Sequence, residues 1–393
     1  MIVLAGGSIV LPDRVLPDAS VLIDGSQIVD IVERRRIDSA GAQVIDVSGS
    51  YVVPGFIDVH VHGVEGHDTL DGGDAVREMA MRLPRYGVTA FCPTSVACPP
   101  NALRALCDQV RRARLLGVSD GARVLPAHLE SNFINPEYRG AQPPTCLRVP
   151  GAPTEGDFSA RDIMTAMSVA RADIGIVTIA PELPGGLALV RSLVAVGHRV
   201  SLGHSGADYD TAIAAIDAGA RHATHLFNRM TPMTHRAPGL VGAILARAEI
   251  AAEVICDGHH VHPAMCRMAI AAKGVARVMA ITDGTAGSGL PVGSTATLGG
   301  RAIRVTDVAA TLDDGTLAGS TLTMDRAFRN LVTRFGMSIV DAAALCSTSA
   351  ARELGLPTLG AIERDATADL VVLDRDFNVS RTFVDGREVY QRC

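Results

Sequence analysis

The segment VPGFIDVHVHG (residues 53–63) begins as an apolar run and ends in polar side chains. Its first part is the short, continuous apolar stretch typical of a strand that is buried on both faces. His60 and His62 are two positions apart, and because strand side chains alternate, both point to the same face. We therefore expect a core strand that delivers two imidazoles to one site.

Outward from this segment, buried-type strands alternate with amphipathic helical patterns such as 101–116, 186–196 and 209–219. The predicted strands are 53–60, 89–96, 122–129, 174–180, 199–204, 222–227, 250–256 and 276–282. This alternation over roughly 300 residues predicts an α/β fold of the (β/α)₈ TIM-barrel type. A doubly wound open sheet is the alternative, but no GxGxxG or GxxxxGK[ST] loop follows any predicted strand.

Both ends of the chain have a different pattern, with short alternating strands and Gly-containing turns such as Asp24-Gly25. Residues 1–53 and 355–393 share this pattern, whereas 54–354 carry the strand–helix alternation. We expect the two ends to combine into a small β-sandwich domain beside the barrel.

Composition limits the class of protein. The 393 residues are 48% hydrophobic and 20% charged, which indicates a globular chain with a buried core. A net charge of −6 disfavours a nucleic-acid partner, and no apolar run approaches the ~18 residues of a membrane span. The eight cysteines form no CxxC pair and the N-terminus shows no signal-peptide pattern, so we expect a reduced, cytoplasmic protein.

Further polar residues follow the predicted strands at their carboxyl ends, in HLE (128–130), GHS (203–205), THL (224–226) and TDG (282–284). Barrel enzymes place their catalytic groups at this end. Isolated polar residues at strand ends are ordinary, but a succession of ligand-type residues favours a metal site. The candidates are His60, His62, Glu130, His204, His225 and Asp283. Nitrogen and oxygen ligands without thiolates suit Zn²⁺ or a similar divalent metal.

Several motifs together resemble one known family. They are PGFIDVHVHG (54–63), HLE, GHS, THLFN (224–228), DGHHV (257–261), ITDGTAG (281–287) and LAGSTLTM (317–324). This set resembles the N-acetylglucosamine-6-phosphate deacetylase family of the amidohydrolase superfamily, over nearly the whole chain. Related branches bridge two metals with a carbamylated lysine on the fourth strand. The single lysine of this chain, Lys273, lies outside that strand, which excludes such a bridge here.

The resemblance implies the role of each ligand. Glu130, His204 and His225 would hold the main metal, and His60, His62 and Asp283 would complete a second site. One or two divalent ions per subunit are expected, Zn²⁺ first, with Fe²⁺, Mn²⁺ or Co²⁺ as alternatives. Asp283 would be the catalytic residue, a general base that later protonates the departing amine.

The resemblance also implies the substrate and how it is held. The substrate would be a small N-acetyl amino-sugar phosphate whose phosphate contacts Arg236 and His260, one of them supplied by a neighbouring subunit in a homodimer. The loop 317–319 would close over the sugar. The expected substrate-binding residues are Ala141, Gln142, Asn228, Arg229, Arg236, His260, Leu317, Ala318 and Gly319.

Four positions depart from the family's pattern: Ser131, Asn132, Gln142 and Arg229. All four are expected on the substrate side of the site, and none is an expected metal ligand. They leave open the same chemistry on a different N-acyl amino sugar or other N-acyl compound. A catalytically inactive scaffold with this fold is the third possibility.

Overall fold

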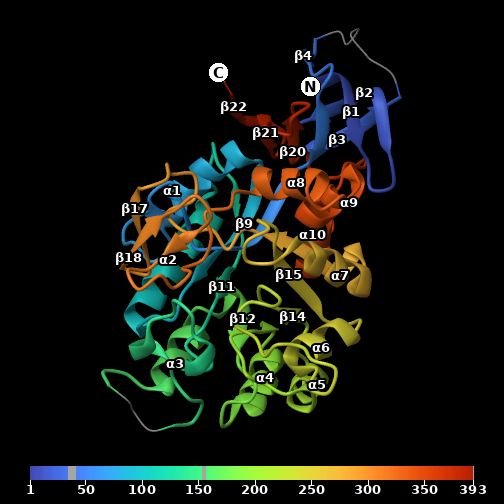
Figure 1. The fold of residues 1–393 in the computed structure, drawn as a ribbon. Helices are drawn as coiled ribbons and strands as arrows, with labels where there is room; N and C mark the ends of the chain where they lie inside the picture. The colour runs from blue at the N-terminus through green and yellow to red at the C-terminus, as the bar shows by residue number, and fades with distance from the viewer. Residues whose placement is uncertain (34–40, 153–155, 393) are drawn as a thin grey trace.

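The fold of the computed structural model is built around a parallel barrel (Figure 1). The structure describes residues 1–33, 41–152 and 156–392. Eight barrel positions follow one another in chain order, each strand parallel to the next. They are β6 (Phe56–Val61), β9 (Val88–Ser95), β10 with β11 (Arg123–Val124 and Ala127–Leu129), β12 (Ile174–Ile179), β13 (Arg199–Leu202), β14 (His222–Ala223), β15 (Ala251–Ile255) and β16 (Val278–Ile281).

The predicted TIM-barrel class is confirmed, and each predicted strand overlaps an observed one. Two strands are shorter than their apolar runs suggest. The third is divided around Pro126, which has no N–H to offer a neighbouring strand. The sixth ends at Ala223, because the backbone soon turns to positive φ at His225 and Phe227 and leaves the sheet.

The barrel closes where its first and last strands meet. Asp283 N donates to His60 O at 2.9 Å, and His62 N donates to Gly284 O at 2.7 Å. The Thr282 hydroxyl donates to the buried Asp58 carboxylate at 2.5 Å. These bonds join β6 to the end of β16 at the carboxyl end of the barrel, which is the end expected to carry the site.

Helices pack around the barrel and bury their apolar faces against it. Predicted helices over 101–116, 186–196 and 209–219 correspond to three observed helices, Pro100–Leu116, Gly186–Ala195 and Tyr209–Asp217. The helices are α1 (Ala75–Arg82), α2 (Pro100–Leu116), α3 (Ala160–Val169), α4 (Gly186–Ala195), α5 (Tyr209–Asp217), α6 (Gly239–Ala246), α7 (Pro263–Lys273), α8 (Met324–Thr333), α9 (Ile339–Ala343) and α10 (Ser349–Leu354). No helix in the described part of the chain is both long enough and apolar enough to cross a bilayer.

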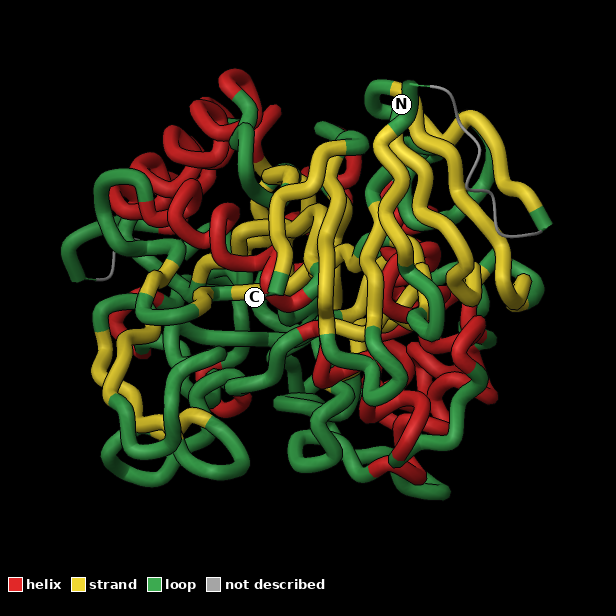
Figure 2. The backbone as a smooth tube through the Cα atoms, turned by 90° about the horizontal axis from the view of Figure 1, so that it is seen from above, coloured by secondary structure: helices red, strands yellow, loops and turns green. Residues whose placement is uncertain are grey.

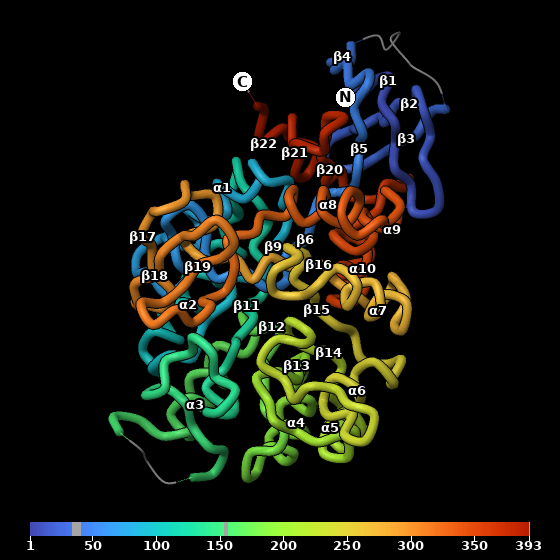
Figure 3. The backbone as a smooth tube through the Cα atoms, in the orientation of Figure 1, coloured from blue at the N-terminus to red at the C-terminus, as the bar shows by residue number. Residues whose placement is uncertain are grey.

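The two ends of the chain combine into one mixed sheet, seen from above in Figure 2. Its strands are β1 (Ile2–Val10), β2 (Val15–Asp24), β3 (Gln27–Val32), β4 (Gln43–Asp46), β5 (Tyr51–Pro54), β20 (Leu370–Leu373), β21 (Val379–Val384) and β22 (Arg387–Gln391). β5 pairs with β1 on one side and with β20 on the other, so it connects the N-terminal strands to the C-terminal ones. Figure 3 follows the chain from β5 of this sheet into β6 of the barrel.

A small antiparallel sheet that the sequence analysis did not predict follows β16. It consists of β17 (Thr295–Leu298), β18 (Arg301–Val305) and β19 (Ala310–Thr311). Its buried side chains form a separate apolar cluster that includes Val96 and Ala318. This cluster anchors the start of the 317–324 segment beside the carboxyl end of the barrel.

Gly55, at the joint between the terminal sheet and the barrel, gives a test of this packing. A Cβ at this position would overlap the side chain of Thr89, lying 2.7 Å from its Cβ, and Thr89 is buried. Gly55→Ala should therefore destabilise the fold by about 2 kcal/mol, the usual cost of overpacking a core. Urea denaturation followed by circular dichroism measures this loss.

Gly72→Ala is the matched control, since nothing lies within 4 Å of a Cβ placed there. Its denaturation midpoint should equal that of the unmodified chain. Equal midpoints for all three proteins would contradict the close packing at this joint.

Candidate metal centre and active site

Three side chains from three strand ends meet at one point, where two histidines approach the same carboxylate oxygen of Glu130. Glu130 follows β11, His204 follows β13 and His225 follows β14. Glu130 Oε1 lies 2.7 Å from His204 Nε2 and 2.8 Å from His225 Nε2, and the two nitrogens are 3.0 Å apart. All three residues are buried. This triad has the spacing and ligand types of a metal site.

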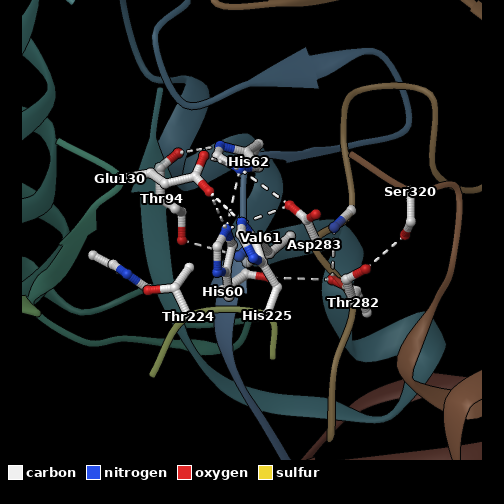
Figure 4. Close-up of polar contacts among 12 residues, drawn as sticks. His60, Val61, His62, Thr94, Glu130, Thr224, His225, Thr282, Asp283 and Ser320 are labelled. Atoms are coloured by element: carbon white, nitrogen blue, oxygen red, sulfur yellow. Dashed lines mark hydrogen bonds and ion pairs between the residues drawn. The ribbon is translucent and has the colours of Figure 1, made fainter. Parts of the chain in front are cut away.

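His60, His62 and Asp283 form a second group that adjoins the first. His62 Nε2 lies 3.2 Å from His60 Nε2 and 3.2 Å from Asp283 Oδ1. It also lies 3.5 Å from Glu130 Oε2, so the carboxylate of Glu130 faces both groups. Figure 4 shows His60, His62, Glu130, His225 and Asp283 turned toward one another. The structure therefore brings together all six predicted ligands.

The hydrogen bonds of the histidines fit a bound cation. Nδ1 of His204 donates to the carbonyl of Tyr138 at 2.8 Å, and Nδ1 of His62 donates to that of Thr94 at 3.2 Å. In a neutral ring this leaves the lone pair of Nε2 directed at the other ligands. Lone pairs and carboxylate oxygens this close repel one another unless a cation or an imidazole proton lies between them. A backbone carbonyl that fixes the far ring nitrogen is also a common feature of metal-bound histidines.

The surroundings of the two carboxylates favour their ionised form, which is the form that binds a metal. Burial alone would raise the pKa of Glu130, but His204 and His225 hold it well below its ordinary value. Burial also acts to raise the pKa of Asp283, and His60 and His62 outweigh this effect and lower it. The residues present thus fit a divalent metal held by imidazole and carboxylate groups.

Three of the six predicted ligands have an unusual backbone conformation. The φ angle is +47° at His204, +30° at His225 and +50° at Asp283. Positive φ is uncommon for residues other than glycine and is concentrated at functional sites, where the surrounding structure maintains it. At each position the chain turns out of a barrel strand, and the turn accompanies a side chain that faces the site.

Glu253 supports the site and was missed by the sequence analysis. Its Oε2 lies 2.9 Å from His60 Nδ1 and accepts from His225 N at 3.1 Å, while its Oε1 lies 2.8 Å from His222 Nε2. It thereby orients one ligand ring and fixes the backbone of another. A charged residue in the middle of the otherwise apolar strand β15 is the signal that would have identified it.

A cavity of about 70 Å³ opens above these ligands. His62, Glu130, His204, His225 and Asp283 form its floor. Predicted substrate-binding residues contribute to its walls, namely Ala141, Gln142, Asn228, Arg229, His260, Leu317 and Gly319. The structure therefore places most of the predicted substrate side beside the predicted metal side.

Two predicted substrate-binding residues are not in the cavity wall. Arg236 is exposed on the loop between β14 and α6, and it does not line the cavity within the described chain. Ala318 is fully buried in the apolar cluster of the small sheet, which explains how its neighbours Leu317 and Gly319 are held over the cavity.

Two of the four departures from the family's pattern lie elsewhere than predicted. The Ser131 hydroxyl donates to Thr178 O, and the Asn132 amide donates to Cys98 O and Cys146 O. Both side chains are buried and neither lines the cavity, so their placement on the substrate side was wrong. Both side chains donate hydrogen bonds to backbone carbonyls instead.

Gln142 contacts the metal side as well as the cavity. Its amide nitrogen donates to Glu130 Oε2, and its amide oxygen accepts from Ala97 N at 2.7 Å. With both ends bonded, the side chain restrains the carboxylate that faces both groups of ligands. We predicted Gln142 as a substrate contact, and the structure adds this bond to a ligand.

A larger cavity, about 940 Å³, lies at the opposite end of the barrel. Most of its arginines are bound by acidic residues, as in the pairs Arg111 with Asp173 and Arg199 with Glu353. In the described part of the chain, the buried clusters with metal-ligand spacing all contain His60 or Glu130. The chemistry therefore belongs to the smaller cavity.

Known proteins share this fold and these motifs. The model of the amidohydrolase family matches residues 51–389. N-acetylglucosamine-6-phosphate deacetylase from Vibrio furnissii is 35% identical over 379 residues, which cover 95% of this chain and 91% of that protein. N-acetylgalactosamine-6-phosphate deacetylase from Escherichia coli O157:H7 is 34% identical over 354 residues, covering 89% and 91%.

A solved structure agrees with these sequence comparisons. It is an aspartate-to-alanine mutant of the Mycobacterium smegmatis N-acetyl-D-glucosamine-6-phosphate deacetylase, in complex with N-acetyl-D-glucosamine-6-phosphate. That chain is 31% identical to this one and superposes with a TM-score of 0.88, over 99% of both chains. This chain therefore belongs to the N-acetylglucosamine-6-phosphate deacetylase family of amidohydrolases.

Proposed function

We propose that this protein hydrolyses the acetamide of N-acetylglucosamine 6-phosphate to glucosamine 6-phosphate and acetate. The observation that carries the proposal is the convergence of Glu130, His204 and His225 at the floor of the cavity. Amide hydrolysis needs a polarised carbonyl, an activated water and a proton for the departing amine. The site offers a group for each of these needs.

Asp283 is the proton carrier of the proposed mechanism. Its pKa is lowered by His60 and His62, it lines the cavity, and its Oδ1 lies 3.2 Å from His62 Nε2. It accepts a proton from the attacking water as the water oxygen bonds to the acetyl carbon. It then delivers that proton to the sugar nitrogen as the carbon–nitrogen bond breaks.

Glu130, His204 and His225 would hold the main divalent metal, and His60, His62 and Asp283 a second one. When bound, such a metal supplies a Lewis acid for the acetyl carbonyl and lowers the pKa of a water toward ~7. We propose Zn²⁺ because the ligands are imidazoles and carboxylates, with Fe²⁺, Mn²⁺ and Co²⁺ as alternatives.

The cavity wall would bind the sugar and its phosphate. His260 Nδ1 donates to Asp257 at 2.6 Å, and this carboxylate raises the pKa of His260, so that Nε2 of the protonated ring can donate to an anion. Arg236 is exposed. This is expected of an arginine that contacts the phosphate in the cavity of a second subunit. We therefore keep a homodimer in the proposal. A cytoplasmic location is also proposed, since the described cysteines are buried free thiols.

A different N-acyl amino sugar is the second candidate substrate. Gln142 and Arg229 both line the cavity and both depart from the family's pattern. One relative of similar identity is an N-acetylgalactosamine-6-phosphate deacetylase. An inactive scaffold is disfavoured, because such proteins lose their metal ligands and here all six are present.

Chelation tests the metal-dependent reaction. Purified protein should release free amine from N-acetylglucosamine 6-phosphate, lose this turnover after dialysis against a chelator and regain it with Zn²⁺ or Mn²⁺. Turnover that survives chelation would contradict the metal site. Failure to hydrolyse any N-acetyl sugar phosphate would contradict the proposed function as a whole.

Rates on related substrates separate the two candidates. A preference for the 6-phosphate over unphosphorylated N-acetylglucosamine of about 100-fold, equivalent to about 2.7 kcal/mol, supports a phosphorylated substrate. A faster reaction with N-acetylgalactosamine 6-phosphate would favour the second candidate.

Replacing the proton carrier tests the mechanism. Asp283→Asn removes the base without changing the size of the side chain, and kcat should fall by about 10²- to 10⁴-fold. Metal content, measured on the same sample, distinguishes loss of the base from loss of the metal. Asp313→Asn, at an exposed position, is the control and should keep the original kcat. A kcat within threefold of the original for Asp283→Asn would exclude this role.

A further inference from the structure

Three buried, ionisable side chains form a row beneath the predicted metal ligands. Glu253 Oε1 lies 2.8 Å from His222 Nε2, and on the other side of the same ring Glu353 Oε1 lies 3.4 Å from Nδ1. His222 and Glu253 have no exposed surface, and Glu353 is 6% exposed. Glu353 belongs to α10, outside the barrel, whereas the other two come from β14 and β15. We call these three residues the buried ion cluster.

Glu253 connects the buried ion cluster to the metal side. Its Oε2 lies 2.9 Å from His60 Nδ1 and accepts from His225 N at 3.1 Å, while its Oε1 faces His222. Both oxygens of this carboxylate are thus engaged, one toward predicted ligands and one toward the cluster. Rotation of the carboxylate would break contacts on both sides, so the position of the His60 ring depends on the state of His222.

Two arginines hold the opposite end of the cluster. Glu353 Oε1 accepts from Arg199 Nη1 at 2.9 Å, and its Oε2 lies 3.7 Å from Arg277 Nη1. Arg199 begins β13 and lines the larger cavity at the amino end of the barrel. Burial acts to raise the pKa of Glu353, but His222 and the two arginines outweigh this effect and lower it. The surroundings of Glu353 therefore favour its ionised form.

The two carboxylates of the cluster determine the protonation of His222. An ionised carboxylate only accepts hydrogen bonds, and one faces each ring nitrogen, so the ring satisfies both by carrying a proton on each nitrogen. Burial acts to lower the pKa of His222, but Glu253 and Glu353 outweigh this effect and raise it. His128 also faces the ring, with centroids 6.2 Å apart, and burial lowers its pKa to about 3, which keeps it neutral. A positive charge on His222 is therefore placed between two negative ones.

Double protonation of His222 constrains the geometry of Glu253. A neutral imidazole carries one proton, which can lie on either nitrogen, and with the proton on Nδ1 the bare Nε2 would repel the facing oxygen of Glu253. An imidazolium has a donor at both nitrogens, so Glu253 always faces a donor. Glu353 favours this charged form because its carboxylate faces Nδ1. The orientation of Glu253 thus depends on a residue on the far side of the His222 ring.

We propose that Glu353 is a positioning residue of the metal site, which acts by keeping His222 doubly protonated. The charged ring fixes Glu253, and Glu253 fixes the ring of His60. This inference rests on the proposed function, since that function supplies the metal that His60 would bind. Glu353 is absent from the described residues that line the catalytic cavity, so it acts on the site through its neighbours.

The affinity for Zn²⁺ tests this role. Glu353→Gln removes the charge and keeps the size of the side chain. When the metal-free protein is titrated against a competing chelator dye, the free Zn²⁺ concentration at half saturation should rise about tenfold, the lower end of the range for losing a group that orients a metal ligand. Glu363→Gln, at an exposed position beyond α10, is the control and should stay within threefold of the unmodified protein. An unchanged affinity for Glu353→Gln would overturn the proposal.

A double-mutant cycle separates positioning from general stabilisation. Glu253→Gln should itself weaken Zn²⁺ binding about ten- to a hundredfold. The double variant of Glu253→Gln with Glu353→Gln should bind Zn²⁺ within threefold of Glu253→Gln alone, because Glu353 acts only through Glu253. Losses that multiply would contradict this order of action. If Glu253→Gln does not fold, His222→Gln takes its place in the same cycle, since it removes the intervening link.

The protonation of His222 is a second readout, and it needs no metal. In ¹⁵N spectra of the metal-free protein at pH 7, both ring nitrogens of His222, identified by their loss in His222→Gln, should carry a proton. In Glu353→Gln, the second proton should be lost at a pH lower by about one unit or more, equivalent to at least a tenfold change in proton affinity. If Glu353 only stabilised the fold, Glu353→Gln would lower the urea midpoint and leave the His222 titration unchanged. That result would exclude the positioning role.

These measurements stay separate from the test of the proposed function because they require no turnover. If the protein binds Zn²⁺ but hydrolyses no N-acetyl sugar phosphate, the proposed function fails. The Zn²⁺ affinities and the His222 titration then still decide the role of Glu353.

Discussion

Closure of the barrel between its first and last strands is the constraint on which the site depends. Asp58 and Thr282 bond to each other across this seam, and the backbones of His60 and Asp283 are joined just above them. Ligands on β6 and after β16 would otherwise belong to opposite edges of an open sheet. The seam thus brings the two ends of a long segment together at one site, to which the intervening strands contribute Glu130, His204 and His225.

The interior of the barrel beneath the ligands is strongly polar. Glu253 is fully buried and contacts His60 and His222, and the latter lies 3.4 Å from Glu353. Burying such groups costs free energy that their mutual attraction only partly offsets. An apolar core would be at least as stable, so this network is better explained by the need to hold metal ligands in fixed orientations. Positive φ angles at three predicted ligands likewise indicate that the orientation of these side chains is maintained at a cost in backbone strain.

Much of the barrel and its ligands could be predicted from the sequence because both follow short, regular rules. Apolar runs mark the strands, and the residues that follow them, such as Glu130 and His204, face the carboxyl end of the barrel. Glu253 escaped because its importance depends on three contacts with residues distant in sequence. The direction in which a loop side chain points could not be predicted from the sequence either, as Ser131 and Asn132 show.

The use of Glu130 where related enzymes use a modified lysine has a consequence for how the protein becomes active. A carbamate forms only when an amine captures dissolved carbon dioxide, so enzymes that rely on one depend on its local supply. In this protein the carboxylate that faces both groups of predicted ligands is the side chain of an ordinary residue, Glu130, and needs no modification. The single lysine, Lys273, donates instead to a backbone carbonyl of α6, Ile244 O, at 2.9 Å. Under the proposed function, the set of metal ligands is therefore complete in the folded polypeptide, without a carbamate.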